Sequence, residues 1–344
     1  MMTGRSLYLA GVVAGIVVTG ALAGCSSSGV TTAGAARPLE ARVITVDAVP
    51  AAEEGGLYVA QAQGFFAQFG LTVKIKSITG AENGIPDLQA GRAQLVAGNY
   101  VPFIMAQMAG SFDRKPVSLR IIAAGAQIQP GSEALYVMPR SRFQTLAELA
   151  RAHARIGLDA GDDAGGVLVG ALLAQAGYQL GDIRQVIPAA GVTALSGMLS
   201  SGLVDAAWLP QPIGEASEQR YGALPVADFD QGSLQDFPFT GYVGSAQWVI
   251  THPDTVAAFV RALSEGQQLA DTDRAAVESA MEQYTDIPPV IADTMAIDSY
   301  PLEMDVPQLQ RVADSMYEFG LTPGAKAPYQ MAGMIQPEPG LTGG

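Results

Sequence analysis

The chain has 344 residues, of which 19 are Lys or Arg and 33 are Asp or Glu, so its formal charge at neutral pH is −14. Such an acidic chain lacks the cationic surface that phosphate backbones require, which argues against nucleic acid as a partner. One cysteine and two histidines leave little basis for a disulfide framework, a zinc–cysteine site or a histidine-based catalytic centre. We therefore expect no metal and no cofactor.

Residues 1–24 have the layout of an export signal. Arg5 precedes an uncharged apolar run, Leu7 to Ala23, as in secretory signal peptides. The run ends in Leu22-Ala23-Gly24-Cys25, which resembles the lipobox of bacterial lipoproteins, in which the cysteine carries a lipid and becomes the new amino terminus. A plain signal peptide and a spanning helix are the alternatives, but a span needs about 20 apolar residues and this run is shorter. We predict lipidation of Cys25 and a location on the extracytoplasmic face of the cell membrane.

The segment after the signal is rich in Ser, Gly, Thr and Ala, so residues 25–40 are predicted to form a flexible tether. Cleavage would remove one Arg and no acid, which makes the remaining chain still more acidic. No later stretch is apolar enough to span a bilayer. A chain of this length usually forms two domains.

Strand and helix patterns alternate through the body. Arg42–Asp47 and Thr72–Ile78 predict strands, and Leu57–Gln68 predicts a helix that Gly70 ends. The alternation continues, with strands expected at Leu119–Ala123 and Ile183–Ile187 and helices at Ala164–Ala176 and Thr193–Leu199. This order favours an α/β fold with largely parallel sheets.

Two segments far apart in the chain share one pattern. Leu88–Val96 and Leu199–Ala207 each contain a helix end, a capping Gly and a short apolar strand. The pattern is common enough to arise by coincidence, but it suits two lobes built on one plan. The last third is helical, with apolar stripes at His252–Leu263 and Asp305–Phe319, and residues 323–344 are expected to form an irregular tail.

The segment from Gly56 to Phe66 reads GLYVAQAQGFF and is followed by Gly70-Leu71-Thr72-Val73. Together they resemble the opening of ABC-transporter solute-binding proteins of the nitrate/sulfonate/taurine (SsuA-like) and thiamine-pyrimidine-precursor type. Weaker similarities to the same group follow in its order, at Leu88–Val96, Phe143–Leu149, Leu172–Gly177, Gly202–Ala207 and His252–Leu263.

The resemblance implies the type II periplasmic-binding-protein fold. Each of its two lobes is a mostly parallel sheet flanked by helices, and the ligand lies in the cleft between them. We expect lobe 1 to comprise residues 41–127 plus 240–322, and lobe 2 to comprise residues 128–239. Hinge segments should lie near Gln127–Pro139 and Val226–Gly244.

Four loops should face such a cleft. Glu53 and Glu54 follow the first strand, where they could contact a cationic or NH-rich ligand or simply begin a helix near its positive end. Asn99 and Tyr100 follow another strand and offer polar groups and a flat ring, although Asn is also common in turns. Gly165 lies among small residues at the start of a helix, where a ligand could approach the exposed backbone NH groups.

The helix start before Gly165 carries Asp162 and Asp163, where anion-binding relatives commonly carry Ser or Thr. Asp at such a position commonly caps the helix, and it could instead contact the ligand. In either role its negative charge disfavours an anionic ligand. The last predicted contacts are Thr193, Trp208 and Gln211. Trp208 could stack on a ring of the ligand or belong to the core.

The resemblance implies an extracytoplasmic solute-binding subunit of an ABC importer, monomeric, with permease and ATPase partners and no catalytic residues. The acidic loops favour a neutral or cationic organic ligand, such as a pyrimidine or an amine. A sulfonate, taurine or nitrate is the alternative within the fold. A thiamine-pyrimidine synthase-like enzyme and a non-transport sensor lipoprotein are alternatives of other classes. The chain lacks the cysteine motif of the synthases, because its single cysteine is assigned to the lipid.

Overall fold

A computed structural model describes residues 38–108, 118–159 and 164–337. The predicted signal peptide, Cys25, Asp162 and Asp163 lie outside the described residues, as does most of the predicted tether.

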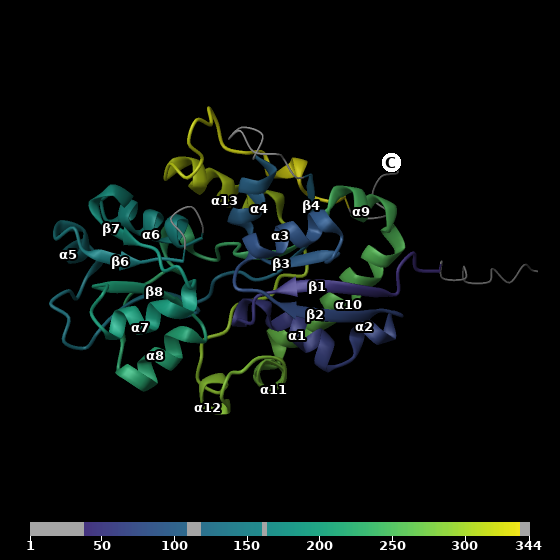
Figure 1. Cartoon of the computed structure of the whole chain (residues 1–344), viewed down its shortest axis with the longest axis horizontal. Coiled ribbons are helices and arrows are strands. Elements are labelled where there is room, and N and C mark those ends of the chain that lie inside the picture. Colours follow the sequence, from purple (N-terminus) through teal and green to yellow (C-terminus); the bar gives the residue numbers. More distant parts are fainter. Residues whose placement is uncertain (1–37, 109–117, 160–163, 338–344) are drawn as a thin grey trace, which may run out of the picture. The chain divides into compact units, whose positions relative to one another are not determined.

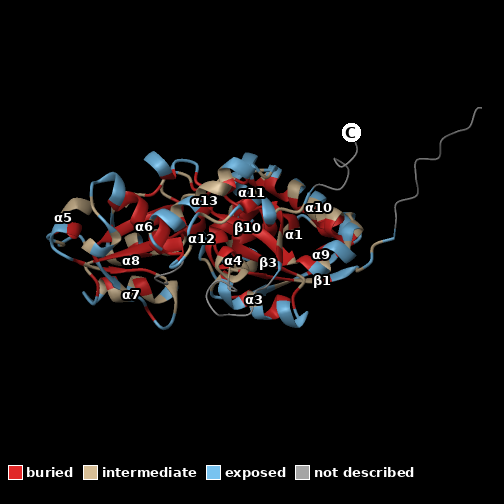
Figure 2. Cartoon of the chain, turned by 90° about the horizontal axis from the view of Figure 1, so that it is seen from above, coloured by how far each residue is buried: buried red, intermediate tan, exposed pale blue. Residues whose placement is uncertain are grey.

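The first sheet has the strand order β2-β1-β3-β10-β4. The strands are β1 (Val43–Ala48), β2 (Thr72–Ser77), β3 (Leu95–Asn99), β4 (Leu119–Ala124) and β10 (Thr240–Ser245). β1 pairs in parallel with β2 and β3, whereas β10 runs antiparallel between β3 and β4. Four strands therefore point one way and only β10 opposes them. β3 and β10 lie among the buried parts of the chain (Figure 2).

The second sheet repeats this plan with the order β7-β6-β8-β5-β9. Its strands are β5 (Glu133–Val137), β6 (Arg155–Gly157), β7 (Arg184–Val186), β8 (Ala206–Pro210) and β9 (Leu224–Asp228). Here β5 is the opposing strand, between β8 and β9. The two mixed sheets confirm the predicted α/β class with mostly parallel strand directions.

The repeated sequence pattern falls at equivalent places of the two sheets. Gly91 precedes β3 and Gly202 precedes β8, and each of these strands is third in the order of its sheet. Both glycines have a left-handed backbone, with φ of 68° and 74°. A left-handed residue ends a helix at low cost only when it lacks a Cβ, which explains Gly at both positions.

Helices cover both sheets (Figure 1). The helices that follow strands of the first sheet are α1 (Gly55–Ala62), α2 (Phe65–Gln68), α3 (Ala81–Ala90), α4 (Tyr100–Gln107), α9 (Ala246–Thr251), α10 (Pro253–Thr272) and α11 (Arg274–Tyr284). Those that follow strands of the second sheet are α5 (Leu146–Arg151), α6 (Ala164–Gln175), α7 (Leu195–Ser200) and α8 (Ile213–Tyr221). α12 (Pro289–Ala292) and α13 (Val306–Glu318) follow in the last part, and α13 packs against both α4 and α6.

Two segments differ from their sequence-based expectations. The helix expected over Leu57–Gln68 is divided into α1 and α2, because Gly64 between them adopts a left-handed φ of 71°. The expected irregular tail contains a 3₁₀ turn, Met331–Gly333, whose end pairs with β4 through the amide of Ile121 and the carbonyl of Met334 at 2.8 Å. Buried Met331 and Met334 anchor this segment to the core.

The chain crosses between the sheets twice, and the crossings lie side by side. The first connects β4 to β5 and the second connects β9 to β10. The amide of Ile128 in the first donates to the carbonyl of Phe237 in the second at 3.0 Å, and Gln127 pairs with Pro238. Both crossings therefore meet at the edge where strands of both sheets end. Within the described ranges, none of the helices combines the length and apolarity that a membrane crossing requires.

Helix α1 approaches α10 closely through small residues. A Cβ built on Gly266 would lie 2.5 Å from the Cβ of Ala60 and 2.5 Å from the carbonyl oxygen of Gly56. The two contacted atoms are a Cβ and a backbone oxygen, so no rotation of a flexible side chain could relieve the contact. This contact holds α1, and the turn that precedes it, in place.

We predict that Gly266→Ala lowers the free energy of unfolding by about 1–3 kcal/mol, because it overpacks this contact. Gly197→Ala on α7 is the matched control, since a Cβ there meets nothing within 4 Å. Urea unfolding of the two variants tests the prediction. Equal stability of the two would contradict it.

Candidate ligand-binding site

Acidic residues follow equivalent strands of the two sheets, β1 and β6. Glu53 and Glu54 lie in a 3₁₀ turn, Ala52–Glu54, between β1 and α1. Asp159 follows β6, which occupies the equivalent position in the second sheet. Ligands of open α/β sheets bind beyond the carboxyl ends of the strands, so these acids stand where a ligand is expected.

Two further acids join them that the sequence did not indicate. Glu133 is the first residue of β5, directly after the first crossing. Asp298 lies in the loop between α12 and α13, and its neighbour Ser299 pairs with Gln127 of the same crossing. We name Glu53, Glu54, Glu133 and Asp298 the carboxyl cluster.

The carboxyl cluster is buried and poorly paired. None of its four residues is more than 9% exposed. Buried oxygens lacking a hydrogen-bond partner are Glu53 Oε2, Glu133 Oε1 and Asp298 Oδ1, whereas the Glu54 carboxyl has the Tyr242 hydroxyl beside it. The ion pairs found among the described residues all use other carboxylates. Buried acids are normally paired, so these unpaired oxygens indicate a place for a partner from outside the chain.

Burial controls the protonation of the carboxyl cluster. It raises the pKa of Glu53 to about 8, with the charge of Asp298 as the second cause. It raises the pKa of Asp298 to about 7, against an opposing effect of the Ser132 hydroxyl. Burial also raises the pKa of Glu54, and Glu53 adds to this rise. A buried carboxyl without a cation thus retains its proton near neutral pH.

Glu133 links the carboxyl cluster to the second sheet. Burial raises its pKa well above the ordinary value, and the charges of Glu53 and Asp298 raise it further. The indole Nε1 of Trp208, on β8, donates to Glu133 Oε2 at 2.6 Å. Glu133 thus interacts with two of the predicted ligand contacts, with Trp208 by a hydrogen bond and with Glu53 by charge. The sequence analysis did not identify Glu133.

Tyrosines surround the cluster. The Tyr300 hydroxyl donates to the carbonyl of Ala52 at 2.7 Å, which fixes the turn that carries Glu53 and Glu54. Gly55 permits this approach, since a Cβ there would lie 2.2 Å from the Tyr300 hydroxyl. The Tyr242 hydroxyl faces Glu54 and opposes the rise of its pKa.

Asn99 and Tyr100 lie together at the end of β3. The Asn99 side chain accepts from the Val101 amide at 3.1 Å and so caps α4, while Tyr100 is buried. Both residues line a pocket that α6 and the second crossing complete. Asn99 therefore has a structural role as well as a place at the pocket.

The small residue predicted at the start of α6 lies against two other parts of the site. A Cβ built on Gly165 would lie 2.7 Å from Asp159 Oδ1 and 3.0 Å from Trp208 Cε3. A larger side chain there would push Trp208 away from Glu133. The predicted acids Asp162 and Asp163 lie outside the described residues.

The last two predicted contacts have local structural partners. Gln211 is buried, donates to the Gly131 carbonyl at 3.1 Å and accepts from the Glu215 amide at 3.0 Å. Thr193 is exposed, and its hydroxyl donates to the Ala190 carbonyl at 3.5 Å. The described residues do not bring Thr193 to the carboxyl cluster, and among them no set of three acidic, His or Cys residues could hold a metal ion.

We predict that raising the pH from about 4 to 8 lowers the melting temperature of the ligand-free protein. As the pH rises from about 4, the unfolded chain, with carboxyls of ordinary pKa, loses protons that the folded protein keeps until the pH reaches about 7 at Asp298 and about 8 at Glu53. By linkage, the free energy of unfolding then falls as the pH rises. Glu53→Gln, which does not titrate, should make the fall less steep.

Thermal unfolding over this pH range measures the effect. Glu265→Gln is the matched control, because Glu265 is exposed on α10. An identical pH profile for wild type and Glu53→Gln would show that this carboxyl does not hold its proton in the folded state.

Comparisons with known proteins agree with this architecture. The alkanesulfonate-binding protein SsuA from Xanthomonas axonopodis pv. citri, solved with MOPS bound, superposes with a TM-score of 0.72 at 18% identity, covering 87% of this chain and 99% of that one. The periplasmic nitrate-binding protein NrtA from Synechocystis PCC 6803 gives 0.73 at 14% identity, covering 84% of each chain. The desulfurization enzyme DSZB superposes with a TM-score of 0.66 at 18% identity, covering 87% of this chain and 97% of that one.

No curated protein is detectably similar in sequence. A family model described as NMT1/THI5 like, however, matches residues 52–273, which include Glu53, Glu54, Glu133 and Trp208. The protein has the fold of the periplasmic solute-binding proteins of ABC importers, as the sequence predicted, and the chain belongs to the NMT1/THI5-like family.

Proposed function

We propose that the protein is the extracytoplasmic solute-binding subunit of an ABC importer, and that its solute is a small organic molecule with a cationic group, such as an amine or an aminopyrimidine. The observation that carries the proposal is the carboxyl cluster, in which Glu53, Glu133 and Asp298 each keep a buried oxygen without a partner within the described chain. A bound cation would pair with these oxygens and let the carboxyls ionise. A carboxyl that keeps its proton could instead donate to a ring nitrogen, so a neutral NH-rich heterocycle also fits.

A sulfonate, taurine or nitrate fits these groups poorly. Anion sites in proteins use cationic side chains or free backbone amides. Here Lys76, one of the few lysines, pairs with Asp47 and Asp87 instead. Glu53 and Glu133 would offer an anion no positive charge, and the anion would prevent these buried carboxyls from ionising. SsuA and NrtA therefore inform the fold of this protein, whereas the side chains at its site favour a ligand of opposite charge.

Binding and delivery suit this site better than catalysis. The carboxyl cluster offers no nucleophile paired with a base, and His153 and His252 both lie outside it. DSZB shows that a related fold can belong to an enzyme, and the NMT1/THI5-like family alone does not decide between the two classes. A sensor that feeds no transporter is the remaining alternative, which a neighbouring permease and ATPase gene would disfavour.

Ligand binding would then promote closure of the two lobes about the paired crossings, and the closed form would dock on the permease. We propose Cys25 as the lipid anchor and residues 25–40 as the tether that keeps this receptor near its permease.

We predict that aminopyrimidines and primary amines raise the melting temperature by mass action, whereas taurine and nitrate do not. Glu133→Gln should weaken binding of the responding cation about 10- to 100-fold, the range expected for loss of a charged hydrogen bond. The variant preserves side-chain shape and an acceptor for Trp208 Nε1, so its fold should persist.

Calorimetry with wild type, Glu133→Gln and the exposed α11 control Glu282→Gln tests this prediction. Tight binding of taurine or nitrate, with no response to pyrimidines or amines, would refute the cationic ligand.

We also predict that the full-length protein partitions with membranes and that Cys25→Ser releases it from them. Thioether lipidation requires the cysteine sulfur, so metabolic labelling with a fatty-acid analogue should disappear in the variant. Continued lipid labelling of Cys25→Ser in the membrane fraction would rule out this anchor.

A further inference from the structure

Residues 289–300 connect the two sheets outside the carboxyl cluster. We name this segment, which begins with α12 and contains Asp298, the strap. In Figure 1 α12 lies between α11, which packs against α1 of the first sheet, and α8, which packs against β5 and β8 of the second. The two sides of the strap are held in different ways.

The side of the strap that faces α11 is bound firmly. Met295 and Tyr300 belong to one buried apolar cluster with Val277 and Met281 of α11. The guanidinium of Arg274, at the start of α11, donates to three carbonyls of the strap, at 3.3 Å to Ala292, 3.1 Å to Asp293 and 2.7 Å to Met295. Apolar burial and hydrogen bonds from a charged donor therefore fix the strap to the first-sheet side.

The strap is held to α8 by exposed polar groups. The Thr294 hydroxyl donates to Glu215 Oε1 at 2.7 Å. Gln219 Nε2 donates to the Thr294 hydroxyl at 3.2 Å and to the Val290 carbonyl at 3.3 Å. We name these three hydrogen bonds the latch. Thr294, Gln219 and Val290 are exposed, so water can replace the bonds of the latch at little cost.

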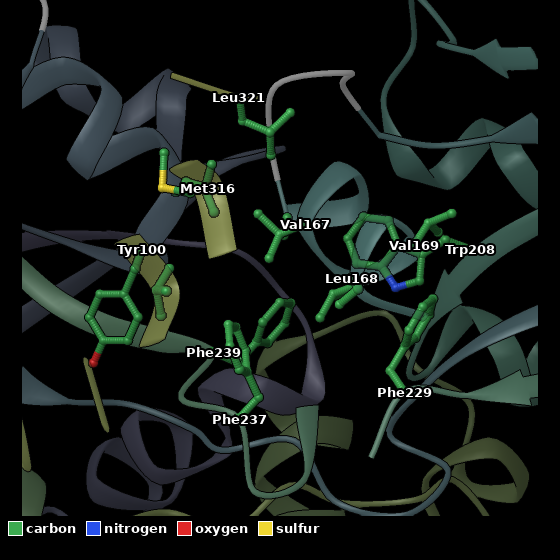
Figure 3. Close-up of a cluster of buried hydrophobic side chains, with 14 of the residues drawn as sticks. Tyr100, Val167, Leu168, Val169, Trp208, Phe229, Phe237, Phe239, Met316 and Leu321 are labelled. Carbon is green, nitrogen blue, oxygen red and sulfur yellow. The ribbon is translucent and has the colours of Figure 1, made fainter. Parts of the chain in front are cut away.

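Elsewhere the two sheets are joined by a buried apolar core. Figure 3 shows this core, in which Met316 of α13 and Val167 of α6 belong to one cluster with Phe239 of the second crossing. Separating these side chains would expose hydrocarbon to water, whereas breaking the latch would not. The two sides of the molecule therefore separate most easily at the strap and α8, with the crossings and α13 as the hinge.

Access to the carboxyl cluster requires such a movement. Its four acids are at most 9% exposed, so a ligand reaches them only after the two sides separate. Asp298 belongs to the strap, and Tyr300 binds the strap to the turn of Glu53 through the Ala52 carbonyl. Glu133, by contrast, begins β5 of the second sheet. Separation at the latch would thus place Glu133 on one side and the other acids on the opposite side.

We propose that the latch forms when the protein closes around its ligand and that its release opens the carboxyl cluster. This inference rests on the proposed function and adds the contact that controls entry to the site. Thr294, Glu215 and Gln219 are positioning residues, because they stabilise the closed arrangement without touching the ligand. Their loss lowers the affinity for every ligand by one factor, since it changes the closed population and leaves the ligand contacts intact.

Thr294→Val breaks the latch, because it removes the hydroxyl and keeps the shape of the side chain. Thr272→Val is the matched control. Thr272 is also exposed, and the hydrogen bonds that its hydroxyl makes within the described chain go to carbonyls of its own helix, those of Gln268 and Leu269. Gln219→Ala removes the donor on α8 and should act as Thr294→Val does, so it serves as the test if Thr294→Val does not fold.

Spin labels on the two sides measure the closed fraction. They are attached at Ser201→Cys, exposed after α7, and at Glu282→Cys, exposed on α11, in the full chain with Cys25→Ser, whose sequence has no other cysteine. Electron–electron distance distributions are recorded with and without 4-aminopyrimidine. Thr294→Val and Gln219→Ala should each lower the closed-to-open ratio about three- to tenfold, the effect of about one hydrogen bond, while Thr272→Val matches the wild type.

Calorimetry with 4-aminopyrimidine measures the consequence for binding. Its affinity for the two latch variants should fall by up to the same factor as the closed-to-open ratio, and its affinity for Thr272→Val should be that of the wild type. A structural defect remote from closure would instead lower the melting temperature without changing the distances.

The outcomes separate the latch from the proposed function. Distances in both latch variants that equal those of the wild type, with and without 4-aminopyrimidine, would overturn the latch whichever ligand the protein binds. Longer distances in both variants, together with no binding of 4-aminopyrimidine by the wild type, would retain the latch and overturn an aminopyrimidine as the solute.

Discussion

The burial of Glu53, Glu54, Glu133 and Asp298, with no cationic partner among the residues that the structure describes, is the constraint on which the candidate site depends. An ionised carboxylate loses several kcal/mol of hydration when it is buried, so the ligand-free site must hold protons instead. A cation can replace those protons without exposing the acids to water. In the receptor that we propose, these groups would offer no positive charge to an anion but could ionise around a cation, so selectivity would come from charge as well as from shape.

The carboxyl cluster is maintained by packing far from the acids themselves. Close contact of α1 with α10 through Gly56 and Gly266 fixes the turn before α1, and Tyr300 holds that turn by its hydrogen bond to Ala52. The paired crossings place Glu133 at the start of β5. Because these supports are backbone contacts or short hydrogen bonds, they can hold four acids near one another although burial disfavours their ionised forms.

Both sheets contribute to the site through equivalent positions, because they share one strand order. The acids after β1 and β6 and the capping glycines before β3 and β8 express this repeated plan. Glu53, Glu54, Trp208 and the mostly parallel sheets could be anticipated, since they lie in local patterns that strands and their following loops produce. Glu133 and Asp298 could not, because one opens an ordinary apolar strand and the other lies in an irregular loop.

The sequence by itself determined the fold class, the order of most strands and helices, and the acidic loop after the first strand. These features follow from hydrophobic periodicity and from glycines at helix ends, which act over a few residues. Only the tertiary structure decided that acids 245 positions apart, Glu53 and Asp298, share one buried volume, and that Trp208 donates to Glu133. Burial and the absence of a counter-charge depend on what surrounds a group in space, and no local pattern in the chain encodes them.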